Sequence, residues 1–304
     1  MKLTIYSPCY NKGATIKRTF ESLINQTCHD FEWIVVNDGS TDNSNILIDE
    51  FSTNLFPIIK IHKKNEGLSS AMNIAVSKAT GEFVLRLDSD DFLRPNAVEK
   101  IIQTINTEVE LNDPKVGALV FLTCFEDNSI VGTHPFEKPT RCNFWDYRIK
   151  YKARGDRAEV FRTEYFRRFP MPQFPNEKFC PEGYVWNHFS DQYDAIYYPD
   201  KIYVRDYQPN SLSKMGVKKW IINPKAANLY LGDILNRNLP FNTYIRLSIT
   251  YYRFSPYTGY SLRRIIKSVP LKATIIGLIP GYIAYIIEKM DTNFLQRIRS
   301  FSQK

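Results

Sequence analysis

The chain has 304 residues, 43% of them hydrophobic and 14% aromatic, which is enough for one large domain or for a domain with a substantial extension. Its five cysteines are scattered and form no CxxC pair, which argues against a zinc site or a disulfide framework and favours reduced thiols in a cytosolic compartment. The first residues carry one early lysine and then polar positions, so we expect no signal peptide and no translocation.

The net charge of +8 is divided unevenly along the chain. Residues 201–304 contain 17 Lys and Arg against 4 Asp and Glu, a net of +13, whereas residues 1–200 contain 23 against 28, a net of −5. A basic tail of this kind indicates a nucleic acid or an anionic membrane surface as a partner. Its aromatic residues lie among long aliphatic runs and not in an Arg/Gly pattern, so we expect no nucleic acid.

The first 125 residues alternate between strand-like and helix-like periods. Short apolar runs predict five strands, at residues 2–7, 31–37, 57–62, 82–88 and 116–125. Apolar residues at helical spacing and capping residues predict four helices between them, at residues 12–27, 40–52, 67–80 and 95–110. This alternation predicts an α/β fold, with a mainly parallel, Rossmann-like sheet covered by helices.

The rest of the chain lacks this alternation. Residues 126–215 are rich in aromatic residues, Arg and Pro, and we expect irregular loops and a few helices there. We therefore predict one domain over residues 1–215, with a first half at 1–125 and a second half at 126–215. Residues 216–304 are predicted to form a basic and apolar C-terminal helical extension.

Polar clusters follow the first four predicted strands. They read "SPCYN", "NDGSTD", "KKNEGLS" and "DSDD" in chain order, the last being residues 88–91. Ligands bind beyond the carboxyl ends of the strands in open α/β sheets, so four clusters on one edge predict a binding site. The alternative for the last cluster is a solvated turn, in which Asp90 or Asp91 caps the following helix with Pro95 in its first turn.

The residue types on this edge suit a nucleotide held by carboxylates and metal. No GxGxxG or GxxxxGK[ST] motif follows the first strand, so the usual glycine-rich phosphate loops are absent from the sequence. Asp88 and Asp90 supply hard oxygen ligands for Mg or Mn, which commonly bridges carboxylates to a diphosphate. Asp38 could accept hydrogen bonds from the donor edge of a base. Tyr10 could provide a stacking face, or could be an ordinary buried loop tyrosine.

These motifs, "YSPCYNKGATIKRTFESLINQTCHDFEWIVVNDGSTDNS" and "NEGLSSAMNIAVSKATGEFVLRLDSDDFLRP", resemble the family 2 glycosyltransferases with the GT-A fold. The resemblance covers about residues 2–125, and it implies that residues 1–125 form the nucleotide-sugar half of the domain and residues 126–215 the acceptor half. It implies transfer of a sugar from a nucleotide-diphosphate donor, most commonly a UDP-sugar, with inversion and with divalent Mg or Mn. By position, it implies that the nucleotide sugar is bound by Pro8, Tyr10, Asp38, Gly67, Asp88 and Ser89. It implies that the metal is bound by Asp90 and Asp88. The chain departs from the family at Lys12, where Glu is frequent, and at Met72, where Arg is frequent.

An inverting transfer is a single displacement, so a base must take the proton of the acceptor hydroxyl as it attacks. We expect this base to be Glu182, which follows Pro181 and precedes a predicted helix at 183–190. The alternative for Glu182 is a first-turn glutamate favoured by the helix dipole. Glu177 is the second candidate for the base.

The basic tail contains a long apolar segment at residues 269–287, preceded by Arg263, Arg264 and Lys267. Apolar insertion and attraction to anionic lipid are the two signals that durable membrane attachment requires. We therefore expect residues 255–290 to lie in or on an anionic membrane, unless they pack on the catalytic domain as a buried helical pair. The resulting prediction is a cytoplasmic enzyme, peripheral on the inner face of the cell membrane, with a saccharide or lipid-linked acceptor for cell-surface polysaccharide. The alternatives are a nucleotidyltransferase and a non-catalytic nucleotide-sugar-binding protein.

Overall fold

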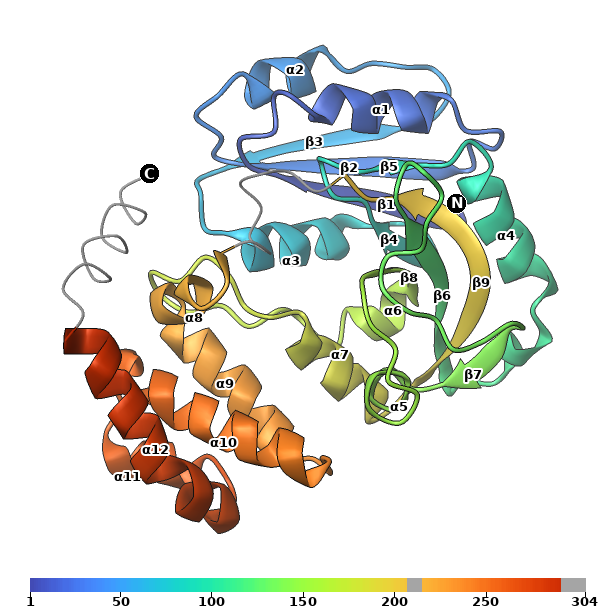
Figure 1. Ribbon diagram of the computed structural model, residues 1–304. Helices are drawn as coiled ribbons and strands as arrows, with labels where there is room; N and C mark the ends of the chain where they lie inside the picture. The colour runs from blue at the N-terminus through green and yellow to red at the C-terminus, as the bar shows by residue number, and fades with distance from the viewer. Residues whose placement is uncertain (207–214, 291–304) are drawn as a thin grey trace. The chain divides into compact units, whose positions relative to one another are not determined.

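The computed structural model describes residues 1–206 and 215–290, which belong to two compact units (Figure 1). The first unit contains Met1–Met171 and Val185–Gln208, and the second contains Pro172–Tyr184 and Pro209–Lys304. The end of the predicted extension, residues 291–304, and residues 207–214 lie outside the described residues. The domain boundary after residue 215 stays a prediction.

All nine elements predicted in the first 125 residues are confirmed. The five strands are β1 (Leu3–Cys9), β2 (Phe31–Asp38), β3 (Ile58–Lys63), β4 (Phe83–Arg86) and β6 (Val116–Cys124). The four helices are α1 (Ile16–Ile24), α2 (Ser44–Glu50), α3 (Leu68–Lys78) and α4 (Ala97–Thr107). A short 3-10 helix, η1 (Val109–Asn112), follows α4. Apolar patterning and helix-capping residues predicted these elements because both signals are local in the sequence.

The first four strands form the parallel part of the sheet, in the order β3-β2-β1-β4. Leu3 at the start of β1 pairs with Phe31 of β2 and Phe83 of β4, so the carboxyl ends of these strands meet at one edge. Every residue of β2 is buried, as expected of a strand covered on both faces. Helices α1 and α2 cover one face of the sheet and α3 covers the other (Figure 1).

The second half of this unit contains more regular structure than the sequence predicted. Four further strands complete a nine-stranded sheet among the described residues: β5 (Phe92–Leu93), β7 (Thr140–Cys142), β8 (Arg157–Arg162) and β9 (Asp194–Val204). Strand β8 runs antiparallel between β4 and β6, so the sheet is parallel at one side and mixed at the other. The helices are α5 (Phe144–Ile149), α6 (Thr163–Phe166) and α7 (Gly183–Ser190). The aromatic residues form core, as in the stacked rings of Tyr147 and Tyr197, whose centroids are 3.9 Å apart.

The described part of the second unit is helical, as expected. Its elements are α8 (Lys218–Ile222), α9 (Pro224–Leu235), α10 (Phe241–Phe254), η3 (Ser255–Thr258), α11 (Leu262–Lys267) and α12 (Leu271–Met290). Glycines let α12 approach α10 closely, because a Cβ on Gly277 would lie 2.3 Å from the Ser248 carbonyl oxygen. Among the described residues, α12 is the one helix long and apolar enough, by length and composition, to cross a membrane. The helix continues through Pro280, which does not end it.

Candidate active site

Hydrogen bonds join the loops that follow the parallel strands. The Ser89 hydroxyl, after β4, donates to the carbonyl oxygen of Pro8 in β1 at 2.6 Å. The Asn11 side-chain oxygen, after β1, accepts from the Thr41 amide, after β2, at 2.8 Å. Because these contacts lie at the edge where the strand ends meet, the predicted polar clusters form one connected site and not separate turns.

Asp38 joins the ends of β2 and β3. It is 3% exposed, and one carboxylate oxygen accepts from the Lys63 ammonium at 2.7 Å and the Glu66 amide at 3.0 Å. The other oxygen accepts from the amide of Gly67 at 2.7 Å. Burial would lower the pKa of Lys63, but its contacts with Asp38 and Glu66 raise it, which keeps the ammonium charged. Asp38 therefore holds the loop before α3, and its contact with a base stays a prediction.

Tyr10 lies on the loop after β1 with its side chain accessible. The residue is 38% exposed, so the alternative of a buried loop tyrosine is wrong. The next residue, Asn11, has a φ of 52°, a left-handed conformation that asparagine tolerates better than most residues. An accessible ring beside a turned backbone is compatible with the predicted stacking face for a base.

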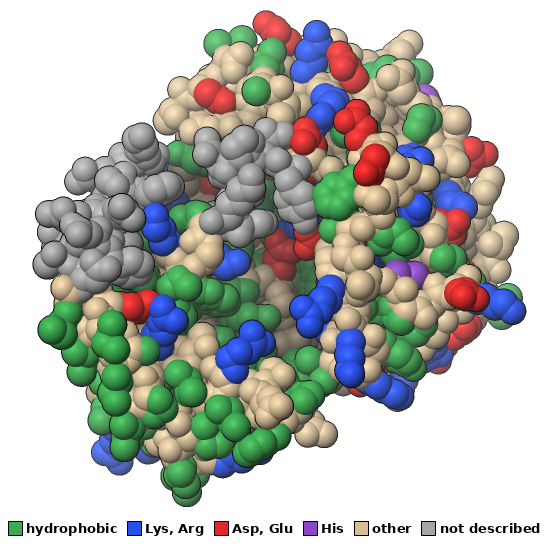
Figure 2. Space-filling view, viewed as in Figure 1, with side chains coloured by type: hydrophobic (Ala, Val, Ile, Leu, Met, Phe, Trp, Pro, Cys, Tyr) green, Lys and Arg blue, Asp and Glu red, His purple; other side chains and the backbone are tan. Residues whose placement is uncertain are grey.

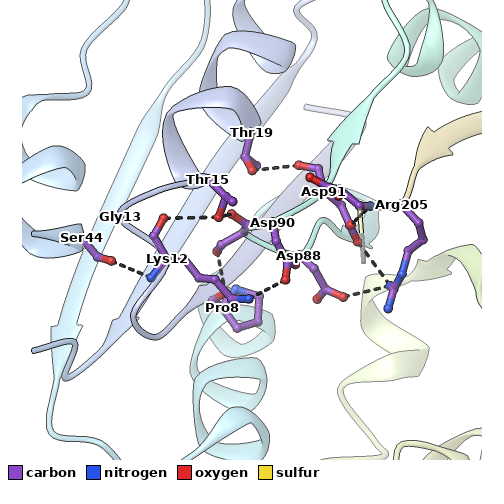
Figure 3. A network of polar contacts seen from close by, with 12 residues as sticks. Pro8, Lys12, Gly13, Thr15, Thr19, Ser44, Asp88, Asp90, Asp91 and Arg205 are labelled. Carbon is purple, nitrogen blue, oxygen red and sulfur yellow. Dashed lines mark hydrogen bonds and ion pairs between the residues drawn. The ribbon is translucent and has the colours of Figure 1, made fainter. Parts of the chain in front are cut away.

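Side chains from the start of α1 hold the backbone of residues 89–91 (Figure 3). Thr15 donates its hydroxyl to the carbonyl oxygen of residue 89 at 2.8 Å. Arg18 donates to the carbonyl oxygen of residue 90 at 2.7 Å, and Thr19 donates to that of residue 91 at 2.8 Å. Three successive carbonyl groups are thus satisfied by one helix, and the carboxylates are presented from a backbone fixed at each residue.

Each of the two predicted metal ligands is paired with a cation. The Lys12 ammonium lies 2.5 Å from an Asp90 carboxylate oxygen. Asp88 pairs with Arg86 at 3.0 Å and with Arg205 at 3.1 Å. Burial would raise the pKa of Asp88, but Arg86, Arg205 and Lys12 hold it below its usual value. Sequence reasoning noted Lys12 only as a departure from the family and missed both arginines as parts of the site, although Arg86 is a conspicuous charge in an apolar strand.

Asp91, the last residue of the cluster, is buried and has a structural role. It is 1% exposed and accepts from the Tyr203 hydroxyl at 2.9 Å and from the Asp206 amide at 2.8 Å. Arg205 lies 3.3 Å from it. Burial raises the pKa of Asp91 to about 7 although Arg205 opposes the shift, and nearby Asp88 adds to it. Asp91 therefore fastens the aspartate loop to the end of β9.

The alternative in which the aspartate cluster caps the following helix is wrong. The helix after the cluster begins at Ala97 with Asn96 as its N-cap, so neither Asp90 nor Asp91 caps it. The chain first forms the short strand β5, which separates the aspartates from α4. Asp156, in the loop before β8, pairs with Arg205 at 3.2 Å.

The residues present fit a hydrated divalent ion better than an ion enclosed by protein. Among residues 1–206 and 215–290, no group of three or more His, Cys, Asp and Glu is arranged to hold a metal. Asp88 and Asp90 could supply one or two carboxylates, with side chains 21% and 17% exposed. Magnesium commonly uses that number of carboxylates and takes its other ligands from substrate phosphates and water.

The two base candidates lie in the second unit. Glu182 directly precedes α7, which spans the predicted residues, so the predicted helix is confirmed. Glu177 accepts from the amides of Lys225 and Ala226, both at 2.9 Å, at the start of α9. Burial raises the pKa of Glu177, opposed by these two amides. Glu177 thus has a structural role at a helix N-terminus, whereas the role of Glu182 as the base stays a prediction.

Comparison with known proteins agrees with this geometry. Residues 4–117 match the family described as Glycosyl transferase family 2. Residues 4–117 are therefore similar in sequence to family 2 glycosyltransferases. A chondroitin synthase from Escherichia coli is 39% identical to the chain over 109 residues. That match covers 36% of this chain and 16% of the synthase, so the chain spans well under two thirds of that relative.

Solved structures of glycosyltransferases are similar to the chain in fold. Residues 1–349 of TarS from S. aureus, in complex with UDP-GlcNAc, match 100% of this chain and 92% of theirs with a TM-score of 0.66 and 18% identity. The mannosyltransferase PcManGT from Pyrobaculum calidifontis, in complex with GDP-Man and Mn²⁺, matches 98% of this chain and 84% of its own with a TM-score of 0.53 and 19% identity. At these identities the likeness establishes the GT-A fold alone.

Proposed function

We propose that the chain moves a sugar from a nucleotide-diphosphate donor, a UDP-sugar, to a hydroxyl group of a saccharide or lipid-linked acceptor. The transfer inverts the anomeric carbon and serves the synthesis of cell-surface polysaccharide. The observation that carries the proposal is the connected edge of the sheet at the ends of β1 to β4, where Asp88 and Asp90 lie within a glycosyltransferase domain. The complexes of the two fold relatives with UDP-GlcNAc and GDP-Man support a nucleotide sugar as the donor.

The nucleoside is assigned to the side of this edge formed by the first three loops. Tyr10 stacks on the base, and Asp38 accepts from its donor edge, for which a carboxylate has lone pairs beyond those used internally. Pro8 and Gly67 line the pocket as backbone surfaces, and Gly67, with a φ of 95°, lets the chain turn into α3. Ser89 fixes the aspartate loop to Pro8 beneath the ribose and diphosphate.

The donor diphosphate is assigned to Asp88 and Asp90. A divalent Mg or Mn ion held by Asp90 and Asp88 would neutralise the charge that develops on the leaving nucleoside diphosphate. The Mn²⁺ in the PcManGT complex supports this assignment. The chain's own contribution is to present the carboxylates from a loop whose residues 89–91 are held by the start of α1.

Glu182 is assigned the proton transfer. As the acceptor oxygen forms its bond to the anomeric carbon, the bond from that carbon to the diphosphate oxygen breaks, and the acceptor proton passes to Glu182. The nucleoside diphosphate leaves with the bonding electron pair. This single displacement inverts the configuration of the anomeric carbon.

A donor-hydrolysis screen tests the enzymatic proposal without knowledge of the acceptor. Purified protein with Mn²⁺ is incubated with a panel of nucleotide sugars, and release of nucleoside diphosphate is measured. We expect turnover of one UDP-sugar, reduced by about 10²-fold or more in Asp90→Asn and unchanged in Asp30→Asn, an exposed aspartate outside the site. Binding without turnover of any donor would indicate a sugar-nucleotide-binding protein, and nucleotide transfer to a sugar phosphate would indicate a nucleotidyltransferase.

The membrane proposal rests on two opposite faces of α12. The inner face packs on α10 and contains Ala273, Thr274, Gly277 and Gly281, all buried. The outer face repeats large apolar residues every three or four positions, each 51–76% exposed: Leu271, Ile275, Ile279, Ile283, Ile286, Ile287 and Met290. Packing on α10, a helix of the same unit, therefore buries the inner face of α12 only. Figure 2 shows hydrophobic side chains gathered over the region of α11 and α12.

Excess positive charge adjoins this outer face. Residues 215–290 contain 11 Lys and Arg against 2 acids, and the two acids pair with arginines, Asp233 with Arg237 and Glu288 with Arg253. Arg263 and Lys267 are exposed on α11. An apolar groove of about 340 Å³ lies between α11 and α12, lined by Leu262, Leu278, Ile279, Tyr282, Ile283 and Ile286. Exposed cations beside an apolar face suit an anionic lipid surface, on which α12 would lie in the plane of the interface.

Vesicle flotation tests this attachment on the full chain. We expect binding to vesicles that contain anionic lipid, weakened by high salt and lost in the double variant Ile279→Glu, Ile283→Glu. Ile46→Glu is the matched control, because Ile46 is an equally exposed isoleucine, 56% accessible, on α2. Wild-type protein that stays unbound on anionic vesicles at low salt would show that the face has another role.

A further inference from the structure

Lys12 is placed to neutralise Asp90 by a backbone that is itself fixed. The Lys12 amide donates to the Ser44 hydroxyl at 2.8 Å, and its carbonyl oxygen accepts from the amides of Thr15 and Ile16 at 2.9 Å. These contacts leave the side chain as the movable part. The ammonium reaches the Asp90 carboxylate, 78 residues away in the sequence, at 2.5 Å.

The pair lies where solvent screens it only in part. The Lys12 and Asp90 side chains are 28% and 17% exposed, compared with 71% and 55% for the surface pair of Lys17 and Glu21, whose charged atoms are 3.8 Å apart. A close pair of low exposure interacts more strongly than a surface pair, and its carboxylate is less available to another cation. Figure 3 shows the Lys12 side chain pointing at Asp90 from the loop that precedes α1.

We infer that Lys12 is the resident counter-ion of Asp90, which a divalent cation must displace in order to bind there. The inference deepens the proposed function, because it rests on the assignment of Asp90 as the metal ligand. Displacement has a cost for the free protein, so the metal binds weakly without a nucleotide. The released ammonium can then pair with the donor diphosphate, which is negatively charged as Asp90 is.

Lys12 thereby couples the metal to the donor. A diphosphate that takes up the ammonium removes the competitor from Asp90 and raises the affinity for the metal. By linkage, the metal raises the affinity for the nucleotide by the same factor. Lys12 acts in this scheme as a positioning residue and not as the base.

The test measures binding of Mn²⁺ directly, by the electron paramagnetic resonance signal of free Mn²⁺, first without and then with UDP. Without nucleotide, we expect Lys12→Met to bind Mn²⁺ at least tenfold more tightly than the wild type. The control Lys17→Met should equal the wild type. Lys12→Arg, which keeps the charge, should also bind weakly. With UDP present, the advantage of Lys12→Met should shrink, so that UDP improves Mn²⁺ binding by a larger factor in the wild type.

The outcomes separate the inference from the proposed function. Equal Mn²⁺ affinity of Lys12→Met and the wild type, with binding lost in Asp90→Asn, overturns the inference and leaves the metal role of Asp90 intact. Mn²⁺ binding that Asp90→Asn does not change overturns the assignment of Asp90 itself, and the inference with it. Thermal unfolding of each variant shows whether the fold is retained. A destabilised Lys12→Met is replaced in the comparison by Lys12→Gln, which also lacks the charge.

Discussion

Replacement of Asp38 by alanine removes one carboxylate and leaves three donors at the end of β2 without their acceptor. They are the amides of Glu66 and Gly67 and the ammonium of Lys63. A buried donor left unsatisfied costs about 1–3 kcal/mol. Part of this cost is recovered, because Lys63 keeps its contact with Glu66 at 2.8 Å. We expect the free energy of unfolding to fall by about 3–5 kcal/mol, the range for breaking a buried pair on one side.

Urea unfolding followed by tryptophan fluorescence measures this change, since Trp33 is fully buried in the same strand. Asp38→Asn keeps the shape and one acceptor oxygen but turns an amide donor toward the remaining donors, so it should lose less than alanine does. Glu66→Gln is the control, because Glu66 is an exposed partner of Lys63 and its change should leave stability almost unaltered. If Asp38→Ala stays within about 0.5 kcal/mol of the wild type, the ordinary range for surface positions, the loop is not held by Asp38. The affinity for UDP, measured without urea at a temperature at which the variant is folded, then reports any separate contact between Asp38 and the base of the nucleotide.

Three further predictions concern the base, a turn and a partly buried histidine. Glu182→Gln should lose most of kcat with donor affinity unchanged, which steady-state kinetics measures. Glu177→Gln should mainly lower the melting temperature in thermal unfolding, because Glu177 holds the start of α9. Gly39→Ala should cost about 1–3 kcal/mol in urea unfolding, because Gly39 has a φ of +68° and a Cβ would lie 2.6 Å from the Asn65 amide nitrogen. Burial, with the charge of Arg157 adding to it, lowers the pKa of His134 from 6.5 to about 4, so protonation favours the unfolded chain. The contribution of neutral His134 to the free energy of unfolding should be fully present above pH 6.5 and lost as the pH falls toward 4. The melting temperature of His134→Gln should therefore change less across that pH range than that of the wild type.

The first half of the domain was predictable because the patterns that specify its strands and helices lie within short stretches of the sequence. A strand such as β2 is buried along its whole length and reads as a continuous apolar run, and each helix between the strands shows an apolar face. Parallel strands joined by short helical crossovers then place all four polar clusters at one edge. The order β3-β2-β1-β4 was not predicted, because the right-handed crossover rule is compatible with several strand orders.

The second half was not predictable in this way, because its strands depend on partners far along the chain. Strand β8 enters between β4 and β6 and runs antiparallel to both, which no local period signals. Its sequence carries arginines at both ends, Arg157 and Arg162, each of which is satisfied by backbone carbonyl groups of other segments. Aromatic richness was the one signal available, and it indicated a packed core without indicating its topology.

The same distinction applies to the candidate site, and it explains why three carboxylates tolerate one another. Asp88, Asp90 and Asp91 were visible as a cluster, whereas the cations that balance them come from positions 12, 86 and 205. Unpaired, this cluster would repel both itself and the anionic diphosphate that we propose it binds. Paired, it is close to neutral before any ligand arrives, and the cations become potential diphosphate partners once a metal takes the carboxylates. The aspartates of this domain should therefore be understood together with Lys12, Arg86 and Arg205, because a substitution at any of these cations changes the charge that a metal and a donor meet.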